Sequence, residues 1–155
     1  MCSRKIHCIR PVDDLKPFAS NSVDLVYASH CLEHFSHRKV NTVLTEWHRV
    51  LKPGGILRLG VPDFDRIIDI YTAKDRNIDA ILPYLMGSQS YPLNFHYCAF
   101  NKASLTDRLK QVGFTTVREW HRDMDELTSL PDCTGMGVEI GDRRIPVSLN
   151  LEAVK

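Results

Sequence analysis

VDLVYA at residues 23–28 and ILRLGV at residues 56–61 are the two stretches that decide the fold. Both are almost wholly apolar and rich in branched residues, which is typical of strands buried on both faces of a parallel sheet. We therefore expect residues 23–28 to form a central strand. Between the two stretches, apolar residues recur at three- and four-residue spacing from Arg38 to Leu51, the pattern of an amphipathic helix. This order predicts a strand-helix-strand crossover, which is right-handed in nearly all parallel sheets.

The other segments extend this pattern to a single α/β domain over residues 1–155. Lys52-Pro53-Gly54-Gly55 should end the first helix, because proline cannot continue the hydrogen-bond ladder and glycine accepts positive φ. Asp63 can cap the next helix. Further helices are expected over residues 63–70, 78–86 and 101–112, strands over residues 6–12, 114–120 and 146–154, a long loop over residues 87–101, and a loop or insertion over residues 121–144.

The composition is that of a soluble globular protein, with 43% hydrophobic and 25% charged residues. Lys and Arg number 20 against 19 Asp and Glu, so the net charge of +1 gives no strong field, and neither nucleic acid nor a membrane is an expected partner. The five cysteines form no C-x-x-C pair and are odd in number, which favours reduced thiols and a cytoplasmic location. No apolar run approaches the roughly 18 residues of a membrane span.

Four motifs occur in the order found in one enzyme family. They are LKPF at residues 15–18 with SVD at 22–24, YASHCLEH at 27–34, RVLKPGG at 49–55 and VPD at 61–63. This ordered set resembles the class I S-adenosylmethionine-dependent methyltransferases of the type-11-like group. The resemblance implies a partial Rossmann-like α/β fold, with a mostly parallel sheet, an antiparallel C-terminal strand and helices on both faces. Cofactor would bind at the carboxyl ends of the strands, where open α/β sheets place ligands.

One part of the family pattern does not occur in the sequence. The resemblance makes residues 6–12 the third strand of the sheet, so the first two strands and their Gly-x-Gly turn would precede Met1. The first glycine in the chain is Gly54. Gly135-Met136-Gly137 follows no clear strand and opens no helix, so it is not predicted to be a cofactor loop. We therefore expect this chain by itself to bind S-adenosylmethionine weakly or not at all.

The resemblance also implies which residues would contact the cofactor. Asp13, the favoured residue, and Asp14 follow the third strand, where an acceptor can meet the adenine amino group. The alternative is that they form an Asx turn or a cap before Pro17. The full set of predicted cofactor residues is Asp13, Asp14, Leu15, Ser29, His30 and Glu33.

His30 and His34 are the predicted catalytic residues, because they follow the strand over residues 23–28 at its carboxyl end. Methyl transfer is an in-line displacement at a sulfonium carbon, and a base is needed only when the acceptor must lose a proton. The alternative is that residues 32–34 simply start the next helix, with Glu33 complementing its dipole and His34 packing under a loop.

The acceptor substrate is expected to meet residues after the next strand and in the long loop. These are Asp63, Phe64, Arg66, Phe95, His96 and Tyr97. The alternative is that the loop aromatics anchor the loop to the core, a reading that suits Phe100 better than His96. Trp47 and Trp120 belong to periodic elements and are predicted to be packing residues.

Two further functions stay open at this point. His30-Cys31-Leu32-Glu33-His34 matches H-x-x-E-H, the inverted zinc-protease signature, so a zinc hydrolase is one alternative, although no metal ligand is assigned. The other is a non-catalytic oligomerisation or interaction module. Whichever function holds, the edge of residues 23–28 is predicted to be closed by residues 6–12 or by a second copy of the chain in a homodimer or other homo-oligomer.

Overall fold

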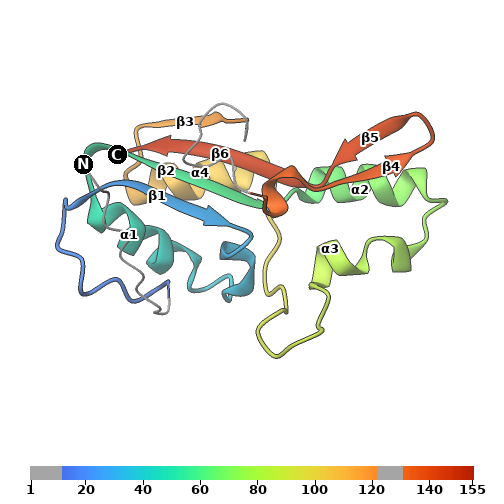
Figure 1. The fold of residues 1–155 in the computed structure, drawn as a ribbon, viewed down its shortest axis with the longest axis horizontal. Helices are drawn as coiled ribbons and strands as arrows, with labels where there is room; N and C mark the ends of the chain where they lie inside the picture. Colours follow the sequence, from blue (N-terminus) through green and yellow to red (C-terminus); the bar gives the residue numbers. More distant parts are fainter. Residues whose placement is uncertain (1–11, 122–130) are drawn as a thin grey trace.

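A four-stranded sheet in the order β1-β2-β6-β3 forms the centre of the molecule (Figure 1). The structure is a computed structural model that describes residues 12–121 and 131–155. The strands are β1 (Val23–Ser29), β2 (Leu51–Pro62), β3 (Thr116–Glu119) and β6 (Ser148–Val154). β1 and β2 are parallel, and β6 is antiparallel to both β2 and β3. The predicted fold class, a mostly parallel sheet with an antiparallel last strand, is confirmed.

The predicted crossover joins β1 to β2 through the helix α1 (Val40–Val50). β2 begins at Leu51, five residues before the expected start at Ile56. Val23 pairs with Leu51 and Leu25 with Ile56, so the intervening residues 52–55 bulge out of the ladder. Gly54 takes a φ of 76° there, which glycine adopts without strain. The proline and glycine signal therefore marks a bulge inside the strand as well as the end of the helix.

β1 differs from the expectation of a central, fully buried strand. Among the described strands it lies at the edge of the sheet, and Ala28 is its one fully buried residue. One flank of the strand has no described neighbour, which explains the partial exposure. Of the predicted strand over residues 6–12, residues 6–11 lie outside the described residues, and Val12 lies in a turn.

The main core lies on one face of the sheet, against α1 and α4 (Lys102–Val112). β2 alternates: Leu57 and Leu59 face this core, while Arg58 faces the other way. The core also contains Phe100 and Trp47, both at most 2% exposed, and Trp120 is buried as well, so the predicted packing roles of all three are confirmed. The helix expected over residues 101–112 is confirmed: Asn101 caps α4, and Gly113 ends it.

A second apolar cluster joins α2 (Phe64–Ala73) to a β-hairpin at the far end of the molecule (Figure 1). The hairpin consists of β4 (Gly137–Ile140) and β5 (Arg143–Pro146), and the 3-10 helix η4 (Cys133–Gly135) precedes it. Residues 121–144 were expected to be a loop or an insertion; the hairpin contradicts the loop reading for this part, while residues 122–130 lie outside the described residues. Val138 pairs with Ile145, and both side chains pack in the cluster with α2. The sequence did not predict this hairpin because strands of four residues are too short to show a periodic pattern.

The remaining helices are short. The expected helix over residues 78–86 is divided into the 3-10 helix η2 (Ile78–Ala80) and α3 (Leu82–Met86), with Pro83 in the first turn of α3. Gly135 ends η4 and Gly137 begins β4, so this G-x-G opens no helix, as expected. Across residues 12–121 and 131–155, no helix has the length and apolar character needed to cross a membrane.

Candidate active site

His30 occupies a tight turn directly after β1. Its φ is 46°, a left-handed conformation that costs a non-glycine residue about 1–2 kcal/mol. The turn is held by a backbone hydrogen bond of 2.9 Å from His30 N to the Gly60 carbonyl of β2. The imidazole Nε2 lies 2.8 Å from Ser148 Oγ, at the start of β6. The sheet therefore holds the ring of His30 against the carboxyl end of β2.

Glu33 lies on the other side of the His30 ring. Its Oε1 is 3.2 Å from His30 Nδ1, and the exposed fractions of the two side chains are 1% and 10%. The Ser148 hydroxyl donates its proton to the Cys133 carbonyl at 2.7 Å, so it accepts the proton that His30 carries on Nε2. Ser148, His30 and Glu33 thus form a row of polar groups at the carboxyl ends of β1 and β2.

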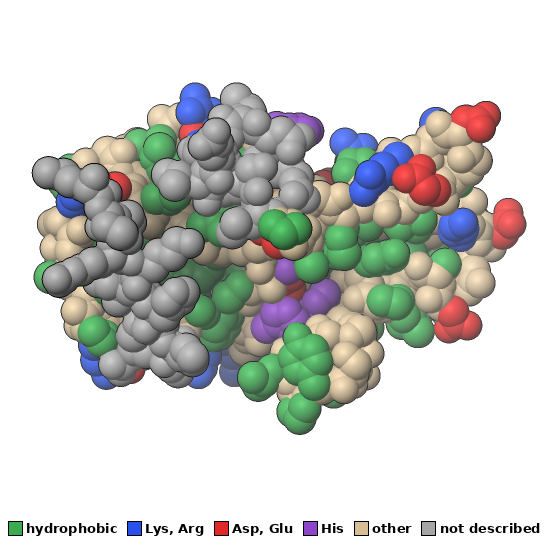
Figure 2. Space-filling view, viewed as in Figure 1, with side chains coloured by type: hydrophobic (Ala, Val, Ile, Leu, Met, Phe, Trp, Pro, Cys, Tyr) green, Lys and Arg blue, Asp and Glu red, His purple; other side chains and the backbone are tan. Residues whose placement is uncertain are grey.

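His34 and His96 are brought together next to Glu33. Glu33 and His34 belong to the 3-10 helix η1 (Leu32–His34), and His96 belongs to the loop before α4. The two rings are 4.9 Å apart in an edge-to-face arrangement. Burial lowers the pKa of His96, although the Glu33 carboxylate opposes that effect. In Figure 2, histidine side chains gather in the middle of this face of the molecule.

The zinc-protease signature needs its histidines on one continuous helix. Here His30 is in a strained turn after β1, and His34 lies on a single 3-10 turn. The zinc-hydrolase alternative therefore loses the helical geometry on which the motif depends. The alternative that residues 32–34 begin a long helix is wrong too, because α1 begins at Val40.

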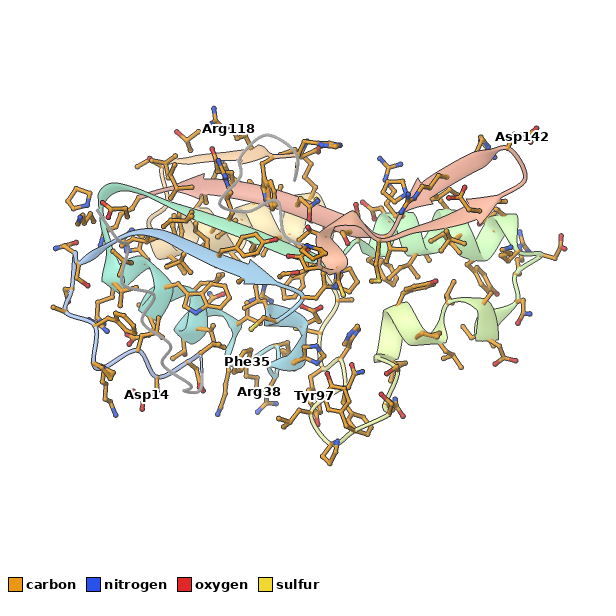
Figure 3. The ribbon with its side chains drawn as sticks, viewed as in Figure 1. Asp14, Phe35, Arg38, Tyr97, Arg118 and Asp142 are labelled. Atoms are coloured by element: carbon orange, nitrogen blue, oxygen red, sulfur yellow. The ribbon has the colours of Figure 1, made fainter. Side chains whose placement is uncertain are left out.

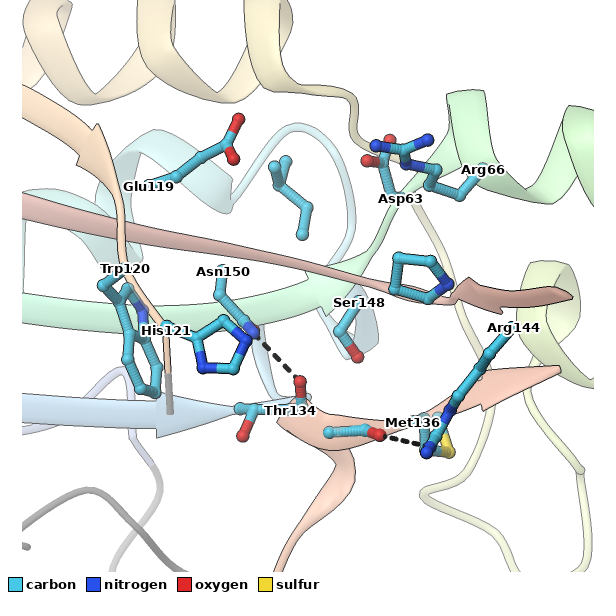
Figure 4. A pocket seen from close by; sticks show the side chains of 13 residues that line it. Asp63, Arg66, Glu119, Trp120, His121, Thr134, Met136, Arg144, Ser148 and Asn150 are labelled. Atoms are coloured by element: carbon cyan, nitrogen blue, oxygen red, sulfur yellow. Dashed lines mark hydrogen bonds between the residues drawn. The ribbon is translucent and has the colours of Figure 1, made fainter. Parts of the chain in front are cut away.

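A cavity of about 460 Å³ opens beside this row, between β6, the end of β3 and the hairpin (Figure 4). Two predicted substrate residues, Asp63 and Arg66, line it. Asp63 caps α2 by accepting a hydrogen bond from Asp65 N, and burial raises its pKa. Sequence reasoning missed several lining residues, because strands far apart in the chain bring them together: Trp120, Thr134, Arg144, Ser148 and Asn150.

The other predicted substrate residues do not line this cavity. Phe64 is 38% exposed at the start of α2. Phe95 and His96 lie beside His34, whose Nδ1 is 3.0 Å from the Phe95 carbonyl. Tyr97 is 62% exposed on the loop (Figure 3), and its backbone N–H donates to the Glu33 carbonyl at 2.8 Å. The structure thus divides the predicted substrate residues between two places.

A second, largely apolar cavity of about 450 Å³ lies along β1. Of the predicted cofactor residues, Leu15 and Ser29 line it, together with Tyr27 and Cys31. Burial, with a contribution from nearby carboxylates, raises the pKa of the Cys31 thiol to about 11, so this thiol stays protonated at neutral pH. A volume of this size is within the range of small-molecule sites, roughly 300–1,000 Å³.

Asp13 and Asp14 line a different, polar cavity with Lys16, Glu46 and Arg49. Lys16 N donates to Asp14 Oδ1 at 3.4 Å, and Lys16 Nζ is 3.9 Å from the same atom. Figure 3 shows Asp14 on the loop before β1. For Asp14, these local contacts agree with the turn that was the alternative to adenine binding.

Comparison with known proteins agrees with this architecture. Residues 5–59 match the model of a methyltransferase domain family. An uncharacterized methyltransferase from Synechocystis is 29% identical over 103 residues, which is 66% of this chain and 43% of that protein. The chain thus spans less than half the length of this curated relative.

Solved structures give the same result for the fold. A methyltransferase from Archaeoglobus fulgidus described as S-adenosylmethionine-dependent matches 99% of this chain and 70% of its own, with a TM-score of 0.59 and 17% identity. A possible histamine N-methyltransferase from Thermotoga maritima matches 93% of this chain and 61% of its own, with a TM-score of 0.55 and 16% identity. In fold, and in sequence over residues 5–59, this chain is similar to the S-adenosylmethionine-dependent methyltransferases.

Proposed function

We propose that this chain forms the acceptor side of an S-adenosylmethionine-dependent methyltransferase site, with His30 at its centre. The observation that carries the proposal is the position of His30 between two cavities. Its neighbour Ser29 lines the apolar cavity along β1, and its hydrogen-bond partner Ser148 lines the cavity beside β6. His30 itself lines neither cavity, so contact with a cofactor or an acceptor would require the ring to turn toward one of them.

The described residues fit part of the cofactor. The apolar cavity offers the Leu15 and Tyr27 side chains as walls, which suits the adenosine group, and Ser29 adds a hydroxyl near the end of β1. S-adenosylmethionine, when bound, supplies a methyl group on a positively charged sulfonium. The methyl acceptor would lie in the cavity of Figure 4, against Asp63 and Arg66.

His30 and Glu33 provide proton chemistry for an acceptor that must lose a proton. Glu33 Oε1 lies 3.2 Å from Nδ1 of His30, so the carboxylate favours the tautomer that carries its proton on that nitrogen. To act as the base, Nε2 of His30 would have to be without the proton that it donates to Ser148 in the structure, so the ring would be neutral and carry its proton on Nδ1, toward Glu33. General-base catalysis of this kind contributes about 10²–10⁴-fold in rate. An acceptor without an acidic proton would need alignment alone.

We expect calorimetric titration of the complete chain with S-adenosylmethionine to give saturable binding about two decades weaker than micromolar. The reason is that the sequence before Gly54 has no glycine loop, and each lost hydrogen bond to a charged group costs about 1.5–3 kcal/mol. Micromolar binding would contradict this weakening. A complete lack of binding, the other outcome expected from the sequence, would contradict the proposal that the cavity along β1 holds the cofactor.

Leu15→Ala tests where the cofactor binds. It removes apolar contact from the wall of the cavity and should weaken binding about tenfold. Leu93→Ala, at a residue that is 80% exposed and lines neither cavity, is the matched control and should leave the dissociation constant unchanged. Equal effects of the two substitutions would place the cofactor elsewhere.

One flank of β1 has no neighbour among the described residues, and this favours a second candidate function, self-association. Within the described part of the chain, β1 pairs with β2 alone, and an apolar cavity runs along it. Exposed apolar edges are sites of strand addition. We expect sedimentation equilibrium to give the mass of a dimer, and we expect Val26→Lys, on β1, to shift it toward the monomer. A monomer at all concentrations would contradict this candidate.

A further inference from the structure

Glu33, His34 and His96 form a cluster of metal-ligating side chains, and the proposed methyl transfer gives no role to the two histidines of this cluster. Each offers one ligand atom, and the three atoms lie within 4.8 Å of one another. They come from two segments, η1 and the loop before α4, which a backbone hydrogen bond of 2.8 Å from Tyr97 N to Glu33 O ties together. A second, of 3.1 Å from His96 N to Met86 O, holds the loop to the end of α3.

The buried carboxylate of Glu33 is the first indication that this cluster binds a metal ion. The residue is 1% exposed, and neither of its carboxylate oxygens has a hydrogen-bond partner among the described residues. Its contact with His30 Nδ1, at 3.2 Å, involves Oε1, so Oε2 has no described polar partner. A buried carboxylate without hydrogen bonds is costly, and in proteins such a group is normally paired or coordinates a metal.

The two histidines are already held in the metal-binding tautomer. Nδ1 of His34 lies 3.0 Å from the Phe95 carbonyl, and Nδ1 of His96 lies 3.0 Å from the Tyr84 carbonyl. A carbonyl only accepts hydrogen bonds, so each Nδ1 must carry the proton. Each neutral ring therefore has its lone pair on Nε2. Backbone carbonyls hold metal-binding histidines in this way in many metalloproteins.

We propose that Glu33, His34 and His96 bind one divalent transition-metal ion, with Zn²⁺ as the best match. Two imidazole nitrogens and one carboxylate oxygen are a donor set that Zn²⁺ binds in tetrahedral geometry, with the fourth position open. Ligand atoms of one zinc ion lie about 3.4 Å apart, given bonds of about 2.0–2.1 Å. The two most distant ligand atoms would thus have to approach each other by at most about 1.4 Å. The ion would supply the missing partner of Glu33.

The test is a titration of the complete chain with Zn²⁺, after treatment with a chelator and without S-adenosylmethionine. We expect one equivalent to bind and the melting temperature to rise, because an ion that binds the folded state stabilises it. Glu33→Gln, His34→Gln and His96→Gln should each weaken binding by about 100-fold. Circular dichroism of the metal-free variants shows whether they remain folded.

His37→Gln is the matched control, because His37 is exposed and lies three residues beyond the cluster. It should bind Zn²⁺ as the unmodified chain does. Equal weakening by His37→Gln and His34→Gln would overturn the inference, as would a chain that binds no ion. The Zn²⁺ titration contains no S-adenosylmethionine, so a chain that binds no Zn²⁺ would not contradict the proposed methyl transfer. A chain that binds no S-adenosylmethionine would likewise not contradict the metal site.

Discussion

Replacing Glu152 by alanine should lower the free energy of unfolding by about 3–5 kcal/mol, because it breaks a buried ionic row. Glu152 is 2% exposed in β6 and lies opposite Arg58 of β2 and Arg118 of β3 in the strand register. Its oxygens accept hydrogen bonds of 2.8 Å from Arg58 Nε and from Arg118 Nε. The Arg58 side chain is 12% exposed, so after loss of the Glu152 carboxylate water could solvate its charge only poorly. Urea unfolding of the two chains measures the difference.

Glu119→Ala is the matched control for this prediction. The Glu119 carboxylate pairs with Lys102 at 2.7 Å, but its side chain is 61% exposed, and exposed pairs contribute at most about 1 kcal/mol. Equal losses for Glu152→Ala and Glu119→Ala would contradict the prediction.

The Glu152 effect should also depend on pH. Burial opposes the ionisation of Glu152, but the hydrogen bonds from Arg58 and Arg118 outweigh it and hold its pKa below the ordinary 4.5. A carboxyl with a lowered folded-state pKa adds stability above its unfolded value and loses it as the pH falls through the folded value. The stability difference between the two chains should therefore be full above pH 4.5 and shrink below it.

This row shows which part of the fold the sequence could predict. The apolar alternation of residues 146–154 predicted a strand with one face less buried, and β6 occupies most of that range. The charge of Glu152 nevertheless lies on a buried face. Its partners are 94 and 34 residues away in the chain, and no local pattern records which residues will share a register position. The periodicity of a segment therefore predicts that it forms a strand, but which residues become its cross-strand neighbours is known only from the assembled sheet.

In the candidate site, too, the sequence predicted some residues and missed others that only the assembled sheet brings together. The order of strand, polar residues and helix placed His30 and Glu33 at the carboxyl end of β1, and the structure confirms that position. Ser148 could not be predicted, because it reaches His30 only through the antiparallel insertion of β6 beside β2. The meeting of His34 and His96 depends on a loop whose course is fixed by backbone hydrogen bonds, for which the sequence carries no periodic signal.

The second large effect should come from Trp47→Ala, with a loss of about 3–5 kcal/mol, because a buried tryptophan leaves a cavity that the helix cannot fill. Trp47 is 1% exposed in α1 and belongs to the main core. Its indole Nε1 also donates a hydrogen bond of 2.9 Å to the carbonyl of Val12. Ile78→Ala, at a residue that is 51% exposed, is the control and should change the stability by at most about 0.5 kcal/mol.

Trp47→Phe separates the two roles of this side chain. It keeps most of the apolar volume and removes the donor, so the expected loss is about 1–2 kcal/mol, from the unmade hydrogen bond and the smaller ring. The Val12 carbonyl directly precedes the loop that contains Asp13 and Leu15, and Val12, Leu15 and Trp47 all line the cavity along β1. Trp47→Phe should therefore raise the dissociation constant for S-adenosylmethionine even under conditions where the chain stays fully folded. The reason is that the loop loses the hydrogen bond that anchors it, while the core keeps most of its packing. Unchanged binding by the folded Trp47→Phe chain would show that this loop does not hold the cofactor.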